Sequence, residues 1–94
     1  PLREIWVTGT PVSGYISFNE DVSQVIALYV DKPRRGEGKA LLDKVKTGRK
    51  YIQLWSHFAN KNAHRFYERE GFKATNLKKN GADGIPELQF EWWD

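Results

Sequence analysis

A glycine-rich and basic segment is the part of this chain best suited to bind an anion. It reads Arg35-Gly36-Glu37-Gly38-Lys39-Ala40 and lies between an apolar run and an amphipathic stretch. Glycines let the backbone turn tightly and let a ligand approach the amides. The first turn of a following helix offers unpaired N–H groups at the positive end of the helix dipole, and Arg35, with Arg34 and Lys39, adds charge-assisted hydrogen bonds. The segment therefore predicts a pyrophosphate site, with a plain strand-to-helix turn and solvated arginines as the alternative.

Two other phosphate-binding motifs do not fit this segment. A P-loop requires Gly-x-x-x-x-Gly-Lys-Ser/Thr, whereas Ala40 follows the lysine here and the glycine spacing differs. A dinucleotide-binding fingerprint requires a third glycine three residues after Gly38, where Leu41 stands. Neither of these nucleotide sites is predicted.

A second chemically promising segment runs from Asn60 to Phe72. Its first residue, Asn60, is a good helix N-cap. The alternative is that Asn60 contacts a ligand, and the two roles are compatible. The Tyr67 hydroxyl can protonate or stabilise a leaving group, although a tyrosine on the same helix face as Ala63 is also what a packed core would contain. His57 and His64 have no carboxylate or cysteine companions at ligand spacing, so no metal site is predicted.

The elements that must position these residues follow from periodicity and from glycine stops. Alternating or continuous β-branched and aromatic residues predict strands, and amphipathic stretches that end before Gly48 and Gly71 predict helices. The predicted strands are residues 4–8, 14–18, 25–30, 51–56, 72–77 and 87–93, and the helices are residues 39–47 and 60–70. This order predicts an α+β fold in which a three-strand antiparallel meander continues into a mixed, mostly antiparallel sheet with the helices packed on it.

Length and composition indicate a single domain spanning residues 1–94. No apolar run reaches the roughly 18–20 residues that cross a bilayer, and the N-terminus has no signal-peptide pattern. We therefore expect no membrane contact. Because cysteine is also absent, we expect no disulfide, and a cytoplasmic location follows as the expectation. The net charge of +3 suits an anionic ligand or a nucleic acid. The basic residues of the chain are scattered and interleaved with 12 acidic ones, which argues against a continuous nucleic-acid-binding stripe.

Both segments resemble motifs of the GNAT (N-acetyltransferase) superfamily. Val30 to Leu42 looks like its acetyl-CoA-binding motif, Arg/Gln-x-x-Gly-x-Gly/Ala, and the fixed positions are matched by Arg35, Gly38 and Ala40. The second segment is similar to Asn-x-x-Ala-x-x-x-Tyr-Glu-x-x-Gly-Phe, and the residues in register are Asn60, Ala63, Tyr67, Gly71 and Phe72. Each motif alone is moderately specific, and the two together, in this order with a strand between them, are much more so.

The resemblance implies an acetyl-CoA-dependent N-acetyltransferase in which a primary amine attacks the thioester directly. The pyrophosphate of coenzyme A would bind the loop made of Arg34, Arg35, Gly36, Glu37, Gly38, Lys39 and Ala40. The pantetheine arm would pair with the backbone of Leu28, Tyr29 and Val30 and with Asn60. Tyr67 would act as the general acid near the sulfur. The amine acceptor is not indicated.

The chain also departs from the family pattern. It lacks the usual first strand and helices, so the fold is expected to be truncated at its N-terminus, with the exposed edge paired in a homodimer. Val25 occupies the position where several relatives carry a glutamate base, and His57 is a candidate replacement. The alternatives are a catalytically weak coenzyme A-binding module and, less favoured, a small basic nucleic-acid-binding domain.

Overall fold

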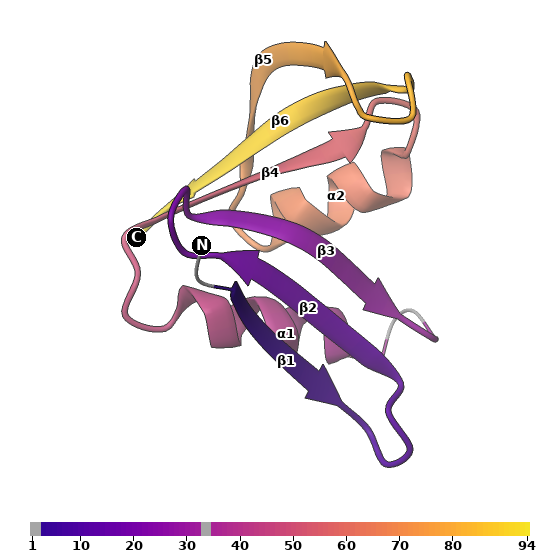
Figure 1. Ribbon diagram of the computed structural model, residues 1–94, viewed down its shortest axis with the longest axis vertical. Coiled ribbons are helices and arrows are strands. Elements are labelled where there is room, and N and C mark those ends of the chain that lie inside the picture. The colour runs from indigo at the N-terminus through magenta and orange to yellow at the C-terminus, as the bar shows by residue number, and fades with distance from the viewer. Residues whose placement is uncertain (1–2, 33–34) are drawn as a thin grey trace.

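The computed structural model describes residues 3–32 and 35–94, which form one six-stranded sheet and two helices. The strands are β1 (Arg3–Thr8), β2 (Gly14–Asn19), β3 (Gln24–Val30), β4 (Tyr51–His57), β5 (Lys73–Asn80) and β6 (Pro86–Trp93), and the helices are α1 (Glu37–Lys46) and α2 (Lys61–Arg69). The sheet order is β1-β2-β3-β4-β6-β5 (Figure 1). The predicted α+β fold, its element order and its mixed sheet are confirmed.

The first three strands form the predicted antiparallel meander. Tyr15 of β2 lies opposite Val7 of β1 and Tyr29 of β3, and the neighbouring Ile16 lies opposite Trp6 and Leu28. Because directly opposed residues share a face of the sheet, the first trio lies on one face and the second on the other. This division separates a core face from a face that carries apolar side chains toward solvent.

The junction between β3 and β4 is short, and it shapes the whole molecule. The two strands are parallel but pair only at Gln24 with Gln53 and at Val25 with Leu54. Beyond this point they diverge toward their C-terminal ends (Figure 1). By contrast, β4 and β6 remain paired antiparallel from Tyr51 to His57. The sheet is therefore split into two halves that are joined only at one end.

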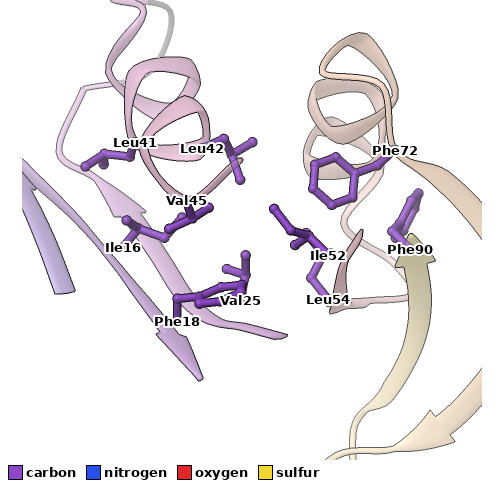
Figure 2. Close-up of a cluster of buried hydrophobic side chains, with 10 residues drawn as sticks. All are labelled: Ile16, Phe18, Val25, Leu41, Leu42, Val45, Ile52, Leu54, Phe72 and Phe90. Atoms are coloured by element: carbon purple, nitrogen blue, oxygen red, sulfur yellow. The ribbon is translucent and has the colours of Figure 1, made fainter. Parts of the chain in front are cut away.

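One hydrophobic core lies under both helices, on a single face of the sheet (Figure 2). Its ten buried members are Ile16, Phe18, Val25, Leu41, Leu42, Val45, Ile52, Leu54, Phe72 and Phe90. Helix α1 covers the β1–β3 half, and α2 covers the other half through contacts such as that between His64 and Phe90, whose ring centroids are 5.0 Å apart. In the described ranges, neither helix is long and apolar enough to cross a membrane.

Helix α1 begins at Glu37, earlier than the predicted start at residue 39. Gly36 precedes it with a φ of 78°, a left-handed conformation that glycine adopts without penalty. The Glu37 carboxylate accepts a hydrogen bond from Ser13 Oγ, which ties the first turn to the β1–β2 connection. Ala40 was predicted on the apolar face, but it is exposed because the core contacts begin at Leu41.

Candidate functional site

A cleft of about 900 Å³ opens where the two halves of the sheet diverge. Its walls are the end of β3, the first turn of α1 and one face of α2. The lining residues are Leu28, Tyr29, Val30, Gly36, Gly38, Lys39, Asn60, Asn62, Ala63, Arg65, Phe66, Tyr67, Arg69 and Glu70. The cleft therefore brings together residues from both of the segments that the sequence singled out.

One wall of the cleft is the edge of β3. Pairing with β4 stops at Val25, so the strand edge from residue 26 to Val30 is not used by the β4 ladder. Leu28, Tyr29 and Val30 of this edge line the cleft. An unpaired strand edge presents N–H and C=O groups that an extended, amide-containing ligand can pair with.

A second wall is the N-terminus of α1. In the described part of the chain, no side chain caps this terminus. The Ala40 amide is already used within the helix, since it donates to the Gly36 carbonyl over 3.0 Å. The N–H groups of the first turn, those of Glu37, Gly38 and Lys39, have no helix carbonyl to pair with. These amides, at the positive end of the helix dipole, are suited to an anionic ligand.

The predicted loop residues do not all reach the cleft. Gly36, Gly38 and Lys39 line it, whereas Arg35, Glu37 and Ala40 are not among the lining residues. Arg34 lies outside the described residues. Lys39 Nζ lies 3.5 Å from a Glu70 carboxylate oxygen across the cleft and 3.3 Å from Asp43. The hydrogen bonds and charge of these two acids raise the pKa of Lys39, so this residue keeps its cation at the mouth of the cleft.

Tyr67 is half-buried and lies on the floor of the cleft. Its ring packs against Phe72 and Phe90, with centroid distances of 5.8 and 5.9 Å. Burial raises the pKa of the Tyr67 hydroxyl to about 12, and no hydrogen bond contributes to the shift. The side chain is therefore both a packing residue and a neutral proton donor that borders the cleft.

Asn60 caps helix α2 and also lines the cleft. Its Oδ1 accepts a hydrogen bond from the Ala63 amide over 3.1 Å, so it is the N-cap of α2. The residue is exposed and also lines the cleft. With the side-chain oxygen used by the cap, the amide nitrogen is the group left for a ligand.

Sequence reasoning missed six lining residues as site residues, all on α2 or just after it: Asn62, Ala63, Arg65, Phe66, Arg69 and Glu70. A helical spacing of three or four residues from Tyr67 could have identified Ala63 and Glu70 as neighbours on one face, and the same spacing from these two residues identifies Phe66. Arg65 and Arg69 add cations to the α2 wall. Among the lining residues that the structure describes, they and Lys39 make three basic side chains against the one carboxylate of Glu70.

The structure has no carboxylate at residue 25, the position where several relatives carry the general base. Val25 is only 5% exposed and belongs to the core. His57 is not among the residues that line the cleft; its Nε2 lies 3.4 Å from Asp83 and 4.0 Å from Glu87. In residues 3–32 and 35–94, no cluster of histidine and acidic side chains could hold a metal ion.

Comparisons with known proteins agree with this geometry. The acetyltransferase (GNAT) domain family matches residues 1–74 of the chain. An uncharacterized N-acetyltransferase from Methanocaldococcus jannaschii is 35% identical, over 63% of this chain and 29% of its own length. The solution structure of apo YjaB from Escherichia coli superposes with a TM-score of 0.78 at 22% identity, over 94% of this chain and 63% of YjaB.

A third relative is Naa50 from Arabidopsis thaliana, solved in complex with the bisubstrate analogue CoA-Ac-MVNAL. It superposes with a TM-score of 0.67 at 21% identity, over 85% of this chain and 64% of Naa50. The chain thus spans less than a third of the archaeal relative and less than two thirds of each of the two solved structures. The match over most of its length shows that the chain belongs to the GNAT acetyltransferase family.

Proposed function

We propose that this chain is an acetyl-CoA-dependent N-acetyltransferase that transfers the acetyl group to a primary amine by direct attack. The observation that carries the proposal is the convergence in one cleft of an unpaired strand edge, the uncapped first turn of α1 and the Tyr67 hydroxyl. Naa50 was solved with a coenzyme A-containing analogue, which supports coenzyme A as the ligand class here.

The described residues fit the chemistry of acetyl-CoA. Its pantetheine arm contains amide groups that can pair with the β3 edge at Leu28 to Val30. Its diphosphate carries charge that suits the amides of Glu37, Gly38 and Lys39 at the helix N-terminus. A Cβ built on Gly36 meets nothing within 4 Å, so this loop leaves open space beside the amides.

Tyr67 supplies the chemistry of the leaving group. As the amine nitrogen bonds to the acyl carbon, the carbon–sulfur bond breaks and negative charge develops on sulfur. A neutral phenol stabilises that charge by donating a hydrogen bond. Because the pKa of Tyr67 is about 12, well above the roughly 8.5 of a thiol, the proton is best shared in a hydrogen bond. The proton finally held by the thiol is then one lost by the amine.

A second candidate function is a coenzyme A-binding module with little turnover. Two observations about the general base favour it. Val25, a buried aliphatic residue of the core, stands where several relatives carry a glutamate base. Glu70, a carboxylate that lines the cleft, is engaged by Lys39 instead of being available as a base. The two candidates share the coenzyme site and differ only in catalysis.

Calorimetric titration with acetyl-CoA, followed by an assay of free thiol release with a panel of amines, tests both candidates. The enzyme predicts micromolar binding and amine-dependent thiol release. Gly38→Asp, which adds a carboxylate at the anion site, should abolish binding, whereas the matched Ala82→Asp in the exposed β5–β6 connection should not. Binding without thiol release would support the module, and a folded wild-type chain that binds no acetyl-CoA would refute both.

A further inference from the structure

The α2 wall of the cleft carries two arginines, Arg65 and Arg69, which are exposed and both line the cleft. Among residues 3–32 and 35–94, no carboxylate oxygen lies within 4.0 Å of either guanidinium. Arg65 donates a hydrogen bond to the neutral Oδ1 of Asn62 instead. In this part of the chain, the two side chains therefore offer positive charge that a ligand in the cleft can use.

Lys39, the other basic residue described in the lining, is already paired. Its Nζ lies 3.3 Å from Asp43 and 3.5 Å from Glu70. Because two acids surround this one ammonium group, Lys39 adds no net positive charge to the cleft. Among the described side chains that line the cleft, the attraction for a polyanionic ligand comes from the two arginines.

The arginines share one stripe of α2 with the ring that touches α1. Residues at i, i+3, i+4 and i+7 of a helix lie on one face, and on α2 these positions are taken by Asn62, Arg65, Phe66 and Arg69. Phe66 is in contact with the first turn of α1, since a Cβ built on Gly38 would be 3.0 Å from the tip of its ring. The stripe of arginines therefore borders the helix N-terminus that is proposed for the diphosphate.

The arginines lie at the mouth of the cleft and not on its floor. Tyr67 and Glu70, on the neighbouring stripe of α2, are half-buried, whereas Arg65 and Arg69 are exposed. All four residues line the same cleft. A ligand with its thioester at Tyr67 and its other end in solvent therefore passes the arginines on its way out.

Coenzyme A has a group at its outer end that suits such a pair of cations. Beyond the diphosphate, its ribose carries a 3′-phosphate monoester, which is one sugar ring away from the diphosphate. A phosphate monoester has a charge of about −1.5 to −2 at pH 7 and three strong acceptor oxygens. Guanidinium groups bind such oxygens in bidentate geometry, and side chains four residues apart on a helix are neighbours that can hold one group together.

We propose that Arg65 and Arg69 bind the 3′-phosphate of the coenzyme, so that the cleft selects acetyl-CoA over acetyl-dephospho-CoA. This inference rests on the proposed function and assigns a further contact and a specificity to the same site. With the diphosphate at the amides of α1, the 3′-phosphate falls at the mouth, where the outer stripe of α2 lies. If the arginines were only solvated surface charges, the two ligands would bind alike.

Calorimetric titration with acetyl-CoA and with acetyl-dephospho-CoA tests the assignment, because the two ligands differ only in the 3′-phosphate. We expect the wild type to bind acetyl-CoA about tenfold more tightly. Arg65→Gln and Arg69→Gln should each weaken acetyl-CoA about three- to tenfold and change acetyl-dephospho-CoA by less than about twofold. Glutamine and arginine have similar helix propensities, so α2 should remain intact.

Lys61→Gln is the matched control. It removes an exposed cation from the same helix, and Lys61 is not among the residues that line the cleft. Both ligands should bind this variant as they bind the wild type. The double variant Arg65→Gln, Arg69→Gln should bind the two ligands with nearly equal affinity.

The outcomes separate this inference from the proposed function. Equal affinity of the wild type for the two ligands would overturn the inference, as would an equal loss for both ligands in the arginine variants, which is expected if the arginines contact the diphosphate. The same loss of preference in Lys61→Gln would also overturn it. In each case the proposed function stands if acetyl-CoA binds and thiol is released. The expected preference without thiol release from any amine would support the inference and remove the enzyme, and a folded wild type that binds neither ligand would refute both.

Discussion

Gly38 of α1 lies so close to Phe66 of α2 that a Cβ on residue 38 would be 3.0 Å from the tip of the phenyl ring. Both residues line the cleft, and Phe66 packs against the core and against Tyr67, with ring centroids 5.4 Å apart. The glycine loop and the helix that carries Tyr67 therefore touch at this point, in addition to the Lys39–Glu70 ion pair. A side chain at residue 38 would disturb both at once.

Gly38→Ala is expected to lower acetyl-CoA affinity about tenfold through displacement of Phe66. Alanine favours a helix by up to about 1 kcal/mol over glycine, whereas overpacking costs about 1–3 kcal/mol. The free energy of unfolding should therefore fall by only about 1 kcal/mol. The double variant Gly38→Ala, Phe66→Leu should recover affinity because the smaller side chain makes room. Titration of the single and double variants checks this, and a double variant no better than Gly38→Ala would contradict the steric explanation.

Gly36 and Gly48 allow a matched test of the loop, since one stands at each end of α1. Their φ values are 78° and 76°, and a Cβ on either meets nothing within 4 Å. Alanine at each should therefore cost the same roughly 1–2 kcal/mol of left-handed backbone strain, measured by chemical denaturation. Only Gly36 lines the cleft, so only Gly36→Ala should also weaken acetyl-CoA. Equal loss of affinity in Gly48→Ala would show that the effect comes from general destabilisation.

Tyr67→Phe is expected to separate catalysis from binding. Removal of the hydroxyl takes away the hydrogen bond to the leaving sulfur, and loss of such a group typically costs about 100-fold or more in rate. The ring still packs on Phe72 and Phe90, so stability and acetyl-CoA affinity should change little. Steady-state rates of thiol release at saturating acetyl-CoA measure the effect. A variant with wild-type turnover would mean that Tyr67 is a core residue only.

Much of this fold could be predicted from local sequence signals. The strands follow alternating β-branched and aromatic residues, and both helices end where Gly48 and Gly71 adopt positive φ values. These signals are local because the periodicity of apolar residues and the glycine stops can each be recognised within one short segment of the chain. The start of α1 was predicted too late because its glycines and charges are typical of a loop, whereas Gly36 and the Ser13 bond to Glu37 start the helix there.

The site was harder to predict because it depends on contacts between distant segments. The cleft exists because β3 and β4 stop pairing after Val25, and nothing in either strand alone encodes that register. The approach of Phe66 to Gly38 likewise arises only once the two helices pack on the assembled sheet. The sequence motifs therefore located the chemistry, while the walls that complete the cleft required the structure.

Tyr67 should also make stability fall at high pH. Burial raises its pKa from 10.0 to about 12, so the unfolded chain releases this proton before the folded chain does. The contribution of Tyr67 is fully present below pH 10, and about 2 kcal/mol of it should be lost by pH 12. Tyr51 has a similarly raised pKa, caused by burial and then by its hydrogen bond to Glu91. Because the wild type and the Tyr67→Phe variant both contain Tyr51, its effect cancels when the two are compared. The difference between wild type and Tyr67→Phe in denaturation from pH 9 to 12 isolates Tyr67, and parallel curves would contradict the assigned burial.

A pair of substitutions separates the two roles of Asn60, which are capping of α2 and contact with the ligand. Asn60→Ala removes the Oδ1 acceptor of the Ala63 amide and should lower the free energy of unfolding by about 1 kcal/mol. Asn60→Asp keeps a capping oxygen and places a negative charge favourably at the N-terminus of α2, so it should be as stable as the wild type. It lacks the amide N–H₂ group that the cap leaves for a ligand, so its acetyl-CoA affinity should still fall several-fold in calorimetry. If Asn60→Asp binds acetyl-CoA like the wild type, Asn60 serves the helix alone, and contacts with the pantetheine arm belong to the β3 edge.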